Sequence, residues 1–190
     1  MKTLMTISVA AALLLAAGAA AGASPALETR QKMGPAATNV ALDVISDWPD
    51  GSRDLAGALI DEYGAPDEIE TSRLTWKSSP PWKKMTVFRD ATDRGHPDSL
   101  LRTVAYRVPV ERWRALEAFG HGVEYDPVSE QLSARTDNED TNYLALNLAD
   151  EVVRGVLSSA EASALYDKTM VLLISGKSSS NTSRLLFKAD

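Results

Sequence analysis

The sequence contains no cysteine, which excludes disulfide bonds, cysteine metal ligands and a lipid-modified cysteine. Its only histidines, His96 and His121, lie far apart without His-x-x-x-His or His-Glu spacing, so a zinc site would need carboxylates from distant positions. The glycine-rich motifs of nucleotide-binding proteins and the Gly-x-Ser-x-Gly motif of esterases are also missing. We therefore expect no metal and no cofactor, and we interpret each histidine as a surface or loop residue.

Positive charge is scarce. The chain has 20 basic and 26 acidic residues, which gives a formal net charge of −6 at pH 7. A nucleic-acid partner needs a concentrated basic surface that dominates the local field. The sequence therefore disfavours nucleic-acid binding.

Long hydrophobic runs are absent except at the start, where Lys2 precedes the apolar stretch from Leu4 to Leu15. An Ala-x-Ala pattern follows within Ala16 to Ala23, and small residues dominate there, where a membrane anchor would need bulky ones. We favour a signal peptide, residues 1–23, cleaved before Ser24. The mature protein is then periplasmic or secreted and has no permanent membrane span.

The rest of the chain predicts one domain of about 130 residues, long enough to bury a core without disulfides. We expect a flexible leader at 24–46, the folded domain at 47–176 and a flexible C-terminal tail at 177–190. Gly34-Pro35 breaks the leader, and Ser178 to Ser183 is polar and low in complexity.

Hydrophobic periodicity and turn residues predict an α+β fold. The expected helices cover 47–63, with Asp47 as its N-cap, 110–119, 137–154 and 159–175. The expected strands form a hairpin at 73–77 and 82–89, a third strand at 100–108 and a second hairpin at 123–126 and 131–136. This order favours an antiparallel sheet of about five strands with helices packed on one face.

The first hairpin gathers indole rings and positive charge in an otherwise acidic chain. The residues concerned are Trp76, Lys77, Trp82, Lys83 and Lys84. Such a surface could hold a carboxylated peptide, a glycan or a phospholipid head group. Alternatively, both tryptophans belong to the core and the lysines are the solvated side. We expect Trp76 to be core and Trp82 to be partly exposed at the turn.

A second group of polar residues surrounds the predicted helix at 137–154. Arg135 precedes the acidic segment Asp137–Asp140, which we interpret as a helix start instead of a calcium site, and is expected to pair with a carboxylate there. Asn147 lies among leucines, where a buried amide needs partners. It either bonds a neighbouring backbone or faces a cleft together with Asn142. Arg135, Asn142 and Asn147 therefore form a candidate polar cluster.

Two stretches carry a resemblance to a known family. They are Tyr63-Gly64-Ala65-Pro66-Asp67-Glu68 leading through Leu74-Thr75-Trp76 to Trp82-Lys83-Lys84, and Ser133-Ala134-Arg135 leading through Asn142 to Leu144-Ala145-Leu146-Asn147-Leu148-Ala149. Together they resemble a family of exported bacterial proteins of unknown function, over about Asp47 to Tyr166. The first stretch is also similar to the helix, Gly-x-Pro turn and hairpin of small outer-membrane assembly proteins and β-lactamase-inhibitor-like modules. These resemblances imply no catalytic residues.

These observations favour a non-catalytic periplasmic binding or protein-interaction module, with an envelope protein or an anionic ligand as partner. The alternative is a small periplasmic hydrolase or metal-dependent enzyme. A pocket in which titratable groups converge, such as a histidine beside carboxylates, would favour the enzyme. An open aromatic surface would favour the binding module.

Overall fold

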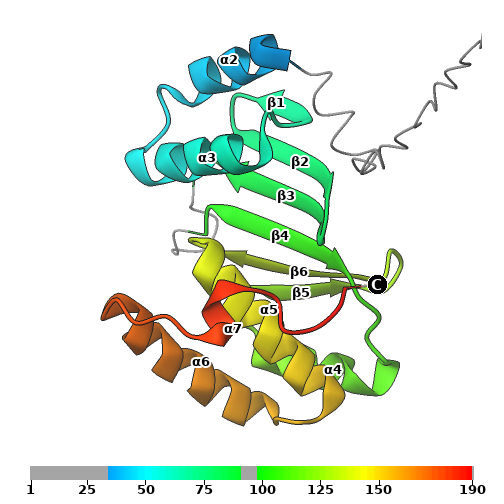
Figure 1. Cartoon of the computed structure of the whole chain (residues 1–190). Helices are drawn as coiled ribbons and strands as arrows, with labels where there is room; N and C mark the ends of the chain where they lie inside the picture. The colour runs from blue at the N-terminus through cyan, green and yellow to red at the C-terminus, as the bar shows by residue number, and fades with distance from the viewer. Residues whose placement is uncertain (1–33, 91–97, 190) are drawn as a thin grey trace, which may run out of the picture.

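The computed structural model describes residues 34–90 and 98–189. The predicted signal peptide lies outside the described residues. Within these two ranges the chain folds into an α+β structure with an antiparallel sheet, as the sequence predicts (Figure 1). No helix in this part of the chain is both long and apolar enough to cross a membrane.

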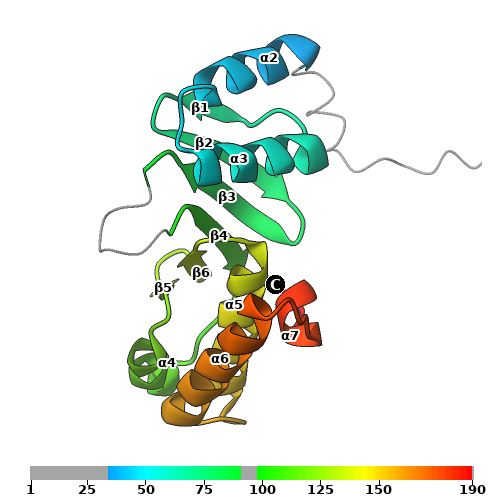
Figure 2. The same ribbon diagram turned by 90° about the vertical axis from the view of Figure 1, so that its left-hand side faces the viewer.

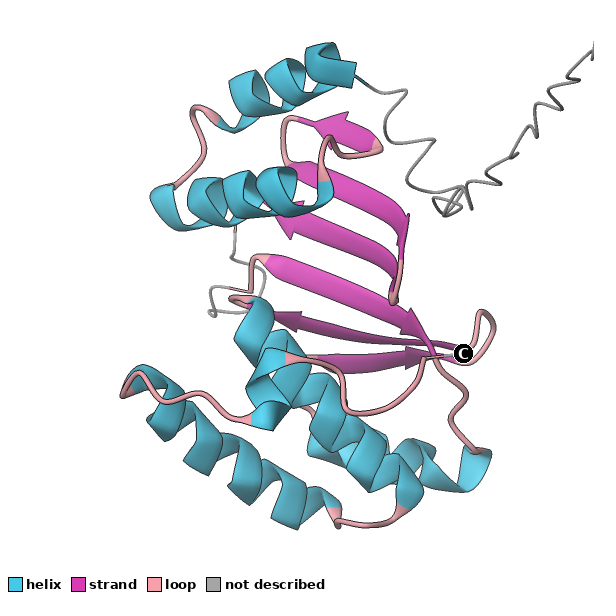
Figure 3. Cartoon of the chain, viewed as in Figure 1, coloured by secondary structure: helices cyan, strands magenta, loops and turns pink. Residues whose placement is uncertain are grey.

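The sheet has six strands in the order β1-β2-β3-β4-β6-β5 (Figure 3). Their bounds are β1 Glu68–Glu70, β2 Arg73–Ser79, β3 Trp82–Phe88, β4 Leu100–Ala105, β5 Val123–Asp126 and β6 Gln131–Thr136. Both predicted hairpins are confirmed, β2 with β3 and β5 with β6. The strand that the sequence did not predict is β1, which pairs with β2 at the edge of the sheet.

One face of the sheet carries the core. The register places Trp76 beside Met85, Met85 beside Arg102 and Arg102 beside Ala134, so these four side chains form a row across four strands. All four are fully buried. Because side chains alternate along a strand, the intervening residues lie on the opposite, open face. The core face therefore contains one charged residue, Arg102, in the middle of its apolar neighbours.

Two groups of helices cover that face (Figures 1 and 2). Helices α2 (Gly34–Ile45) and α3 (Asp50–Tyr63) pack over β1 to β3. The second group packs over β4, β6 and β5 and comprises η1 (Val110–Arg112), α4 (Trp113–Phe119), α5 (Glu139–Arg154), α6 (Ser159–Ile174) and α7 (Ser180–Ser183). Arg102 lies on β4, where the two groups meet.

Local sequence signals fix most helix ends. Helix α3 ends at Gly64, which has a φ of 76°, and α5 ends at Gly155 in the left-handed conformation. Asn138 and Ser158 cap α5 and α6 with reciprocal side-chain and backbone hydrogen bonds. The predicted start of α5 in the acidic segment is thereby confirmed.

The predicted N-cap Asp47 is wrong. Helix α3 starts two residues later, with Pro49 in the capping position. The reason is Trp48, which is buried and donates from its indole Nε1–H to the Thr71 carbonyl at 3.0 Å, so the chain enters the core before the helix begins. Asp47 forms an ion pair with Arg89 instead.

Both ends of the described chain pack against the domain. Residues 34–45 of the expected leader form α2, whose Ala41 and Ile45 are buried. Residues 180–183 of the expected tail form α7, which packs on α5 and buries Thr182 completely. The following residues bond to Asn147 in the middle of α5 and reach the β2–β3 turn, where they form one wall of the groove described below.

Candidate functional site

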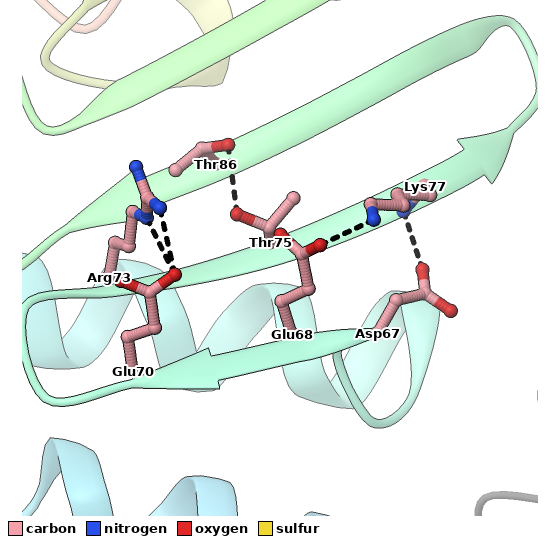
Figure 4. Close-up of polar contacts among 7 residues, drawn as sticks. All are labelled: Asp67, Glu68, Glu70, Arg73, Thr75, Lys77 and Thr86. Carbon is pink, nitrogen blue, oxygen red and sulfur yellow. Dashed lines mark hydrogen bonds and ion pairs between the residues drawn. The ribbon is translucent and has the colours of Figure 1, made fainter.

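The structure separates the residues of the aromatic and basic hairpin. Trp76 is core, as predicted: it is fully buried, and its indole donates to the Gly64 carbonyl at 2.9 Å. On the open face, Lys77 pairs with Glu68, and its backbone N–H donates to the Asp67 carboxylate (Figure 4). Lys84 lies opposite Lys77 in the register and is also exposed there. Trp76, Lys77 and Lys84 therefore do not share a surface with Lys83.

The predicted partial exposure of Trp82 is wrong, because the side chain is only 2% exposed. Its ring lies over the Arg102 guanidinium, with 4.5 Å between the guanidinium carbon and the ring centroid, and contacts Tyr143 of α5 at a centroid distance of 5.6 Å. The strand pairing skips Ser78 and Lys83, and Ser78 has a left-handed φ of 51°. Regular alternation thus ends before the turn, and the indole turns toward the core.

Beside this turn lies a groove with a volume of about 630 Å³, which we call the basic groove. The β2–β3 turn forms one wall, residues 184–189 form the other, and the edges of Trp82 and Tyr143 lie between them. Its lining consists of Ser78, Pro80, Pro81, Trp82, Lys83, Tyr143, Arg184, Leu185, Phe187, Lys188 and Ala189. The groove thus joins segments about 100 residues apart in the sequence.

Asn147 holds the second wall in place. Its side-chain amide donates to the carbonyls of Asn181 at 3.0 Å and Arg184 at 2.8 Å, and its oxygen accepts the N–H of Leu186 at 2.8 Å. The predicted role of Asn147 in bonding neighbouring backbone is confirmed. Phe187 adds an edge-to-face contact with Tyr106 of 5.1 Å between ring centroids. The wall is therefore anchored from the hydrophobic face of α5.

Arg102 lies behind the rings that separate the groove walls. Its side chain is fully buried and pairs through Nη2 with Glu139 at the start of α5. Nε and Nη1 have no hydrogen-bond partner among the described residues. The guanidinium carbon is 4.5 Å from the Trp82 ring centroid and 5.4 Å from that of Tyr143. A buried cation between aromatic rings gains about 2 kcal/mol from each such contact, which offsets part of its desolvation cost.

Among the described residues, a single carboxylate compensates the charge of Arg102. Glu139 is its only ion-pair partner in the part of the chain described, and the Glu139 side chain is 32% exposed. On the α3 side, burial raises the pKa of Tyr63 above its usual value, and the positive charge of Arg102 opposes this rise. The hydroxyl of Tyr63 is therefore neutral at pH 7 and contributes no negative charge.

The predicted polar cluster of Arg135, Asn142 and Asn147 does not come together. Arg135 donates from Nε to the Asp98 carbonyl at 3.0 Å and lies over the Phe88 ring, so the expected pair with Asp137 or Glu139 is wrong. Asn142 is fully buried and donates to the Leu100 carbonyl at 3.2 Å, which ties α5 to β4. Each residue thus has a separate structural role.

A second hollow, of about 450 Å³, contains the titratable groups that would favour an enzyme. Its lining consists of Asp98, His121, Gly122, Arg135, Thr136, Asp137, Tyr166 and Met170. The His121 ring stacks on Tyr166 at a centroid distance of 4.1 Å and makes a tilted contact with Phe119 at 4.9 Å. Burial, with help from Asp137 and Asp98, raises the pKa of Tyr166 to about 12.

These groups do not form a catalytic pair. His121 makes ring contacts, and no carboxylate of the described residues accepts a hydrogen bond from it. The Thr136 hydroxyl donates to the Asn138 carbonyl and is not activated as a nucleophile. Within 34–90 and 98–189, no group of three or more metal-ligating side chains is placed to hold an ion. The hollow therefore has titratable groups without the geometry of nucleophilic or metal-dependent hydrolysis.

His121 should make the fold sensitive to acid. Burial lowers its pKa below the usual 6.5, and the charge of Asp167 only partly opposes this. The unfolded chain therefore binds the proton first as the pH falls, so this contribution to stability is complete above about pH 6.5 and is lost as the pH falls through the lowered pKa.

We expect His121→Phe, which keeps the ring stack, to reduce the drop in melting temperature between about pH 7.5 and about pH 5.5. Thermal unfolding of both proteins at a series of pH values measures this. An unchanged drop in melting temperature would contradict the attribution of the acid sensitivity to His121.

Sequence reasoning missed three basic residues of the site. Arg102 occupies a core-facing position between Leu100 and Val104. A charged residue at a position where the alternation predicts an apolar one was the sequence signal that could have identified it. Arg184 and Lys188 lie in the segment interpreted as a tail, and no local pattern showed that it packs beside the first hairpin.

Comparisons with protein-family models, curated proteins and solved structures gave no match for this chain. The family resemblances proposed from the sequence stay predictions.

Proposed function

We propose that this protein is an exported, non-catalytic binding module that holds its ligand in the basic groove. Export is supported by the sequence of residues 1–23, with a positive start, an apolar stretch and an Ala-x-Ala site. The observation that carries the proposal of binding is the joint construction of the groove by the β2–β3 turn and the anchored segment 184–189. Its volume lies in the range typical of small-molecule sites.

The lining also suits binding better than catalysis. Trp82, Tyr143 and Phe187 provide apolar and aromatic surface, and Lys83, Arg184 and Lys188 provide hydrogen-bond donors around it. Aromatic side chains and arginine are the groups that contribute most to binding surfaces. Among the residues that the structure describes, no histidine, aspartate or glutamate lines this groove, and these are the usual general bases for hydrolysis.

Truncation of Phe187 tests whether the groove is the binding site. The probe is 2-naphthoate, a flat aromatic carboxylate, with binding measured by titration calorimetry. Phe187→Ala removes ring surface from the groove wall and should weaken binding by about tenfold or more, since burying such a ring contributes roughly 1.5–3 kcal/mol.

The matched control is Leu186→Ala, because Leu186 is the neighbouring residue, is 47% exposed and does not line the groove. Its backbone bond to Asn147 is retained in the variant. We expect Leu186→Ala to bind the probe as the wild type does. Equal affinity of both variants and the wild type, or no binding at all, would sink the proposal.

A further inference from the structure

The charges around the basic groove have one sign. Lys83, Arg184 and Lys188 are exposed in its lining, and among residues 34–90 and 98–189 no carboxylate lines it. This is unexpected in a chain that has 26 acidic and 20 basic residues. A concave surface with low-dielectric walls and one sign of charge concentrates ions of the opposite sign.

A fourth positive charge, on Arg102, lies behind the rings of the groove. The Trp82 and Tyr143 rings pack on the guanidinium, and edges of both rings line the groove. Because Arg102 is fully buried, water does not screen its charge on the inner side of these rings. The field of the guanidinium therefore favours a negative group in the groove and disfavours a positive one.

The acidic groups described near the groove offset one of these four positive charges. Glu139 on α5 pairs with Nη2 of Arg102 and compensates one charge of four. Tyr63 on α3, whose pKa burial raises, is neutral at pH 7. Counted over the described residues, the groove and the groups behind it thus carry a net positive charge.

Building on the proposed function, we propose that the ligand of the basic groove is a small organic anion, with a flat apolar body and a carboxylate or phosphate head group. The apolar body packs against the half-buried rings of Phe187 and Tyr143. The head group binds Lys83, Arg184 and Lys188. Arg102 acts as a positioning residue, which holds the two rings and biases the groove toward anions.

Four naphthalene probes test the charge preference by titration calorimetry of the purified protein: 2-naphthoate, 2-naphthyl phosphate, 2-naphthalenemethanol and 2-naphthalenemethylamine. They share the flat body and differ in the head group. The anions should bind at least about tenfold more tightly than the alcohol, because charge-assisted hydrogen bonds are stronger than neutral ones. The amine should bind most weakly, because the positive charges of the groove disfavour a positive head group. The ratio between the carboxylate and the phosphate identifies the head group.

Two variants assign the preference to residues. Lys188→Glu should abolish the advantage of the anions, while the matched change Lys84→Glu, on the open face, should leave it intact. Arg102→Met keeps an unbranched, flexible side chain and removes the charge, so it should reduce the advantage of the anions over the alcohol by about fivefold or more while the affinity for the alcohol stays within about twofold. Circular dichroism checks that each variant is folded.

Equal affinity for 2-naphthoate and the alcohol would overturn the choice of ligand, even if Phe187→Ala showed that the groove is the binding site. An unchanged anion preference in folded Arg102→Met would overturn the role of Arg102. If Arg102→Met does not fold, Lys188→Glu still decides the charge preference. Failure of all four probes to bind, in contrast, would contradict the proposed function itself.

Discussion

Replacement of Trp76 by alanine should lower the free energy of unfolding by about 3–5 kcal/mol. Trp76 is fully buried between the sheet and its covering helices, and truncation leaves a large cavity next to Met85. It also removes the donor to the Gly64 carbonyl, which marks the end of α3. Urea unfolding followed by circular dichroism measures the change.

Trp113→Ala is the matched control, because Trp113 is 40% exposed and its loss should cost less than half as much. Both indoles donate to a backbone carbonyl, so the comparison isolates the effect of burial. Trp82→Ala should resemble Trp76→Ala, since Trp82 is 2% exposed. A Trp76→Ala protein within about 0.5 kcal/mol of the wild type would contradict the placement of Trp76 in the core.

The second large effect is expected for Glu139→Ala. This change leaves the buried guanidinium of Arg102 without its ion-pair partner, which typically costs about 3–5 kcal/mol. The opposite change, Arg102→Met, leaves behind a Glu139 side chain that already reaches water, so its cost should be far smaller. The double change Arg102→Met with Glu139→Gln should recover most of the stability lost in Glu139→Ala.

Asp140→Ala controls for the helix dipole. Asp140 is an exposed acidic residue in the same first turn of α5, and its removal should cost at most about 1 kcal/mol. Equilibrium unfolding of the variants in urea gives the comparison. Equal costs for Glu139→Ala and Asp140→Ala would contradict the account of Arg102 as a buried charge that depends on Glu139.

Much of the fold follows from local signals. Gly64, Gly155, Asn138 and Ser158 fix the ends of three helices, and alternating apolar residues predict both hairpins. Strand β1 escapes such reasoning because it has three residues, two of them glutamates. A strand of that length depends on its pairing with β2 and has no periodicity of its own.

The candidate site was less predictable. The lysines next to Trp82 directed attention to the right turn, but only Lys83 of that group lies in the groove beside the Trp82 ring. The other wall comes from residues 184–189, which Asn147 holds through backbone groups 34 to 39 positions away in the chain. Because the bonds from Asn147 go to backbone groups, the contact leaves no pattern in the sequence of residues 184–189.

The most direct test of the central claim, that the basic groove binds an organic anion, is a titration of the ¹⁵N-labelled protein with 2-naphthoate. Amide and indole resonances are followed by NMR. We expect the largest shifts at Trp82, Lys83, Tyr143 and Phe187, with the resonances of His121 and Tyr166 unmoved. Shifts confined to the hollow around His121 and Tyr166, or no shifts at all, would contradict the central claim.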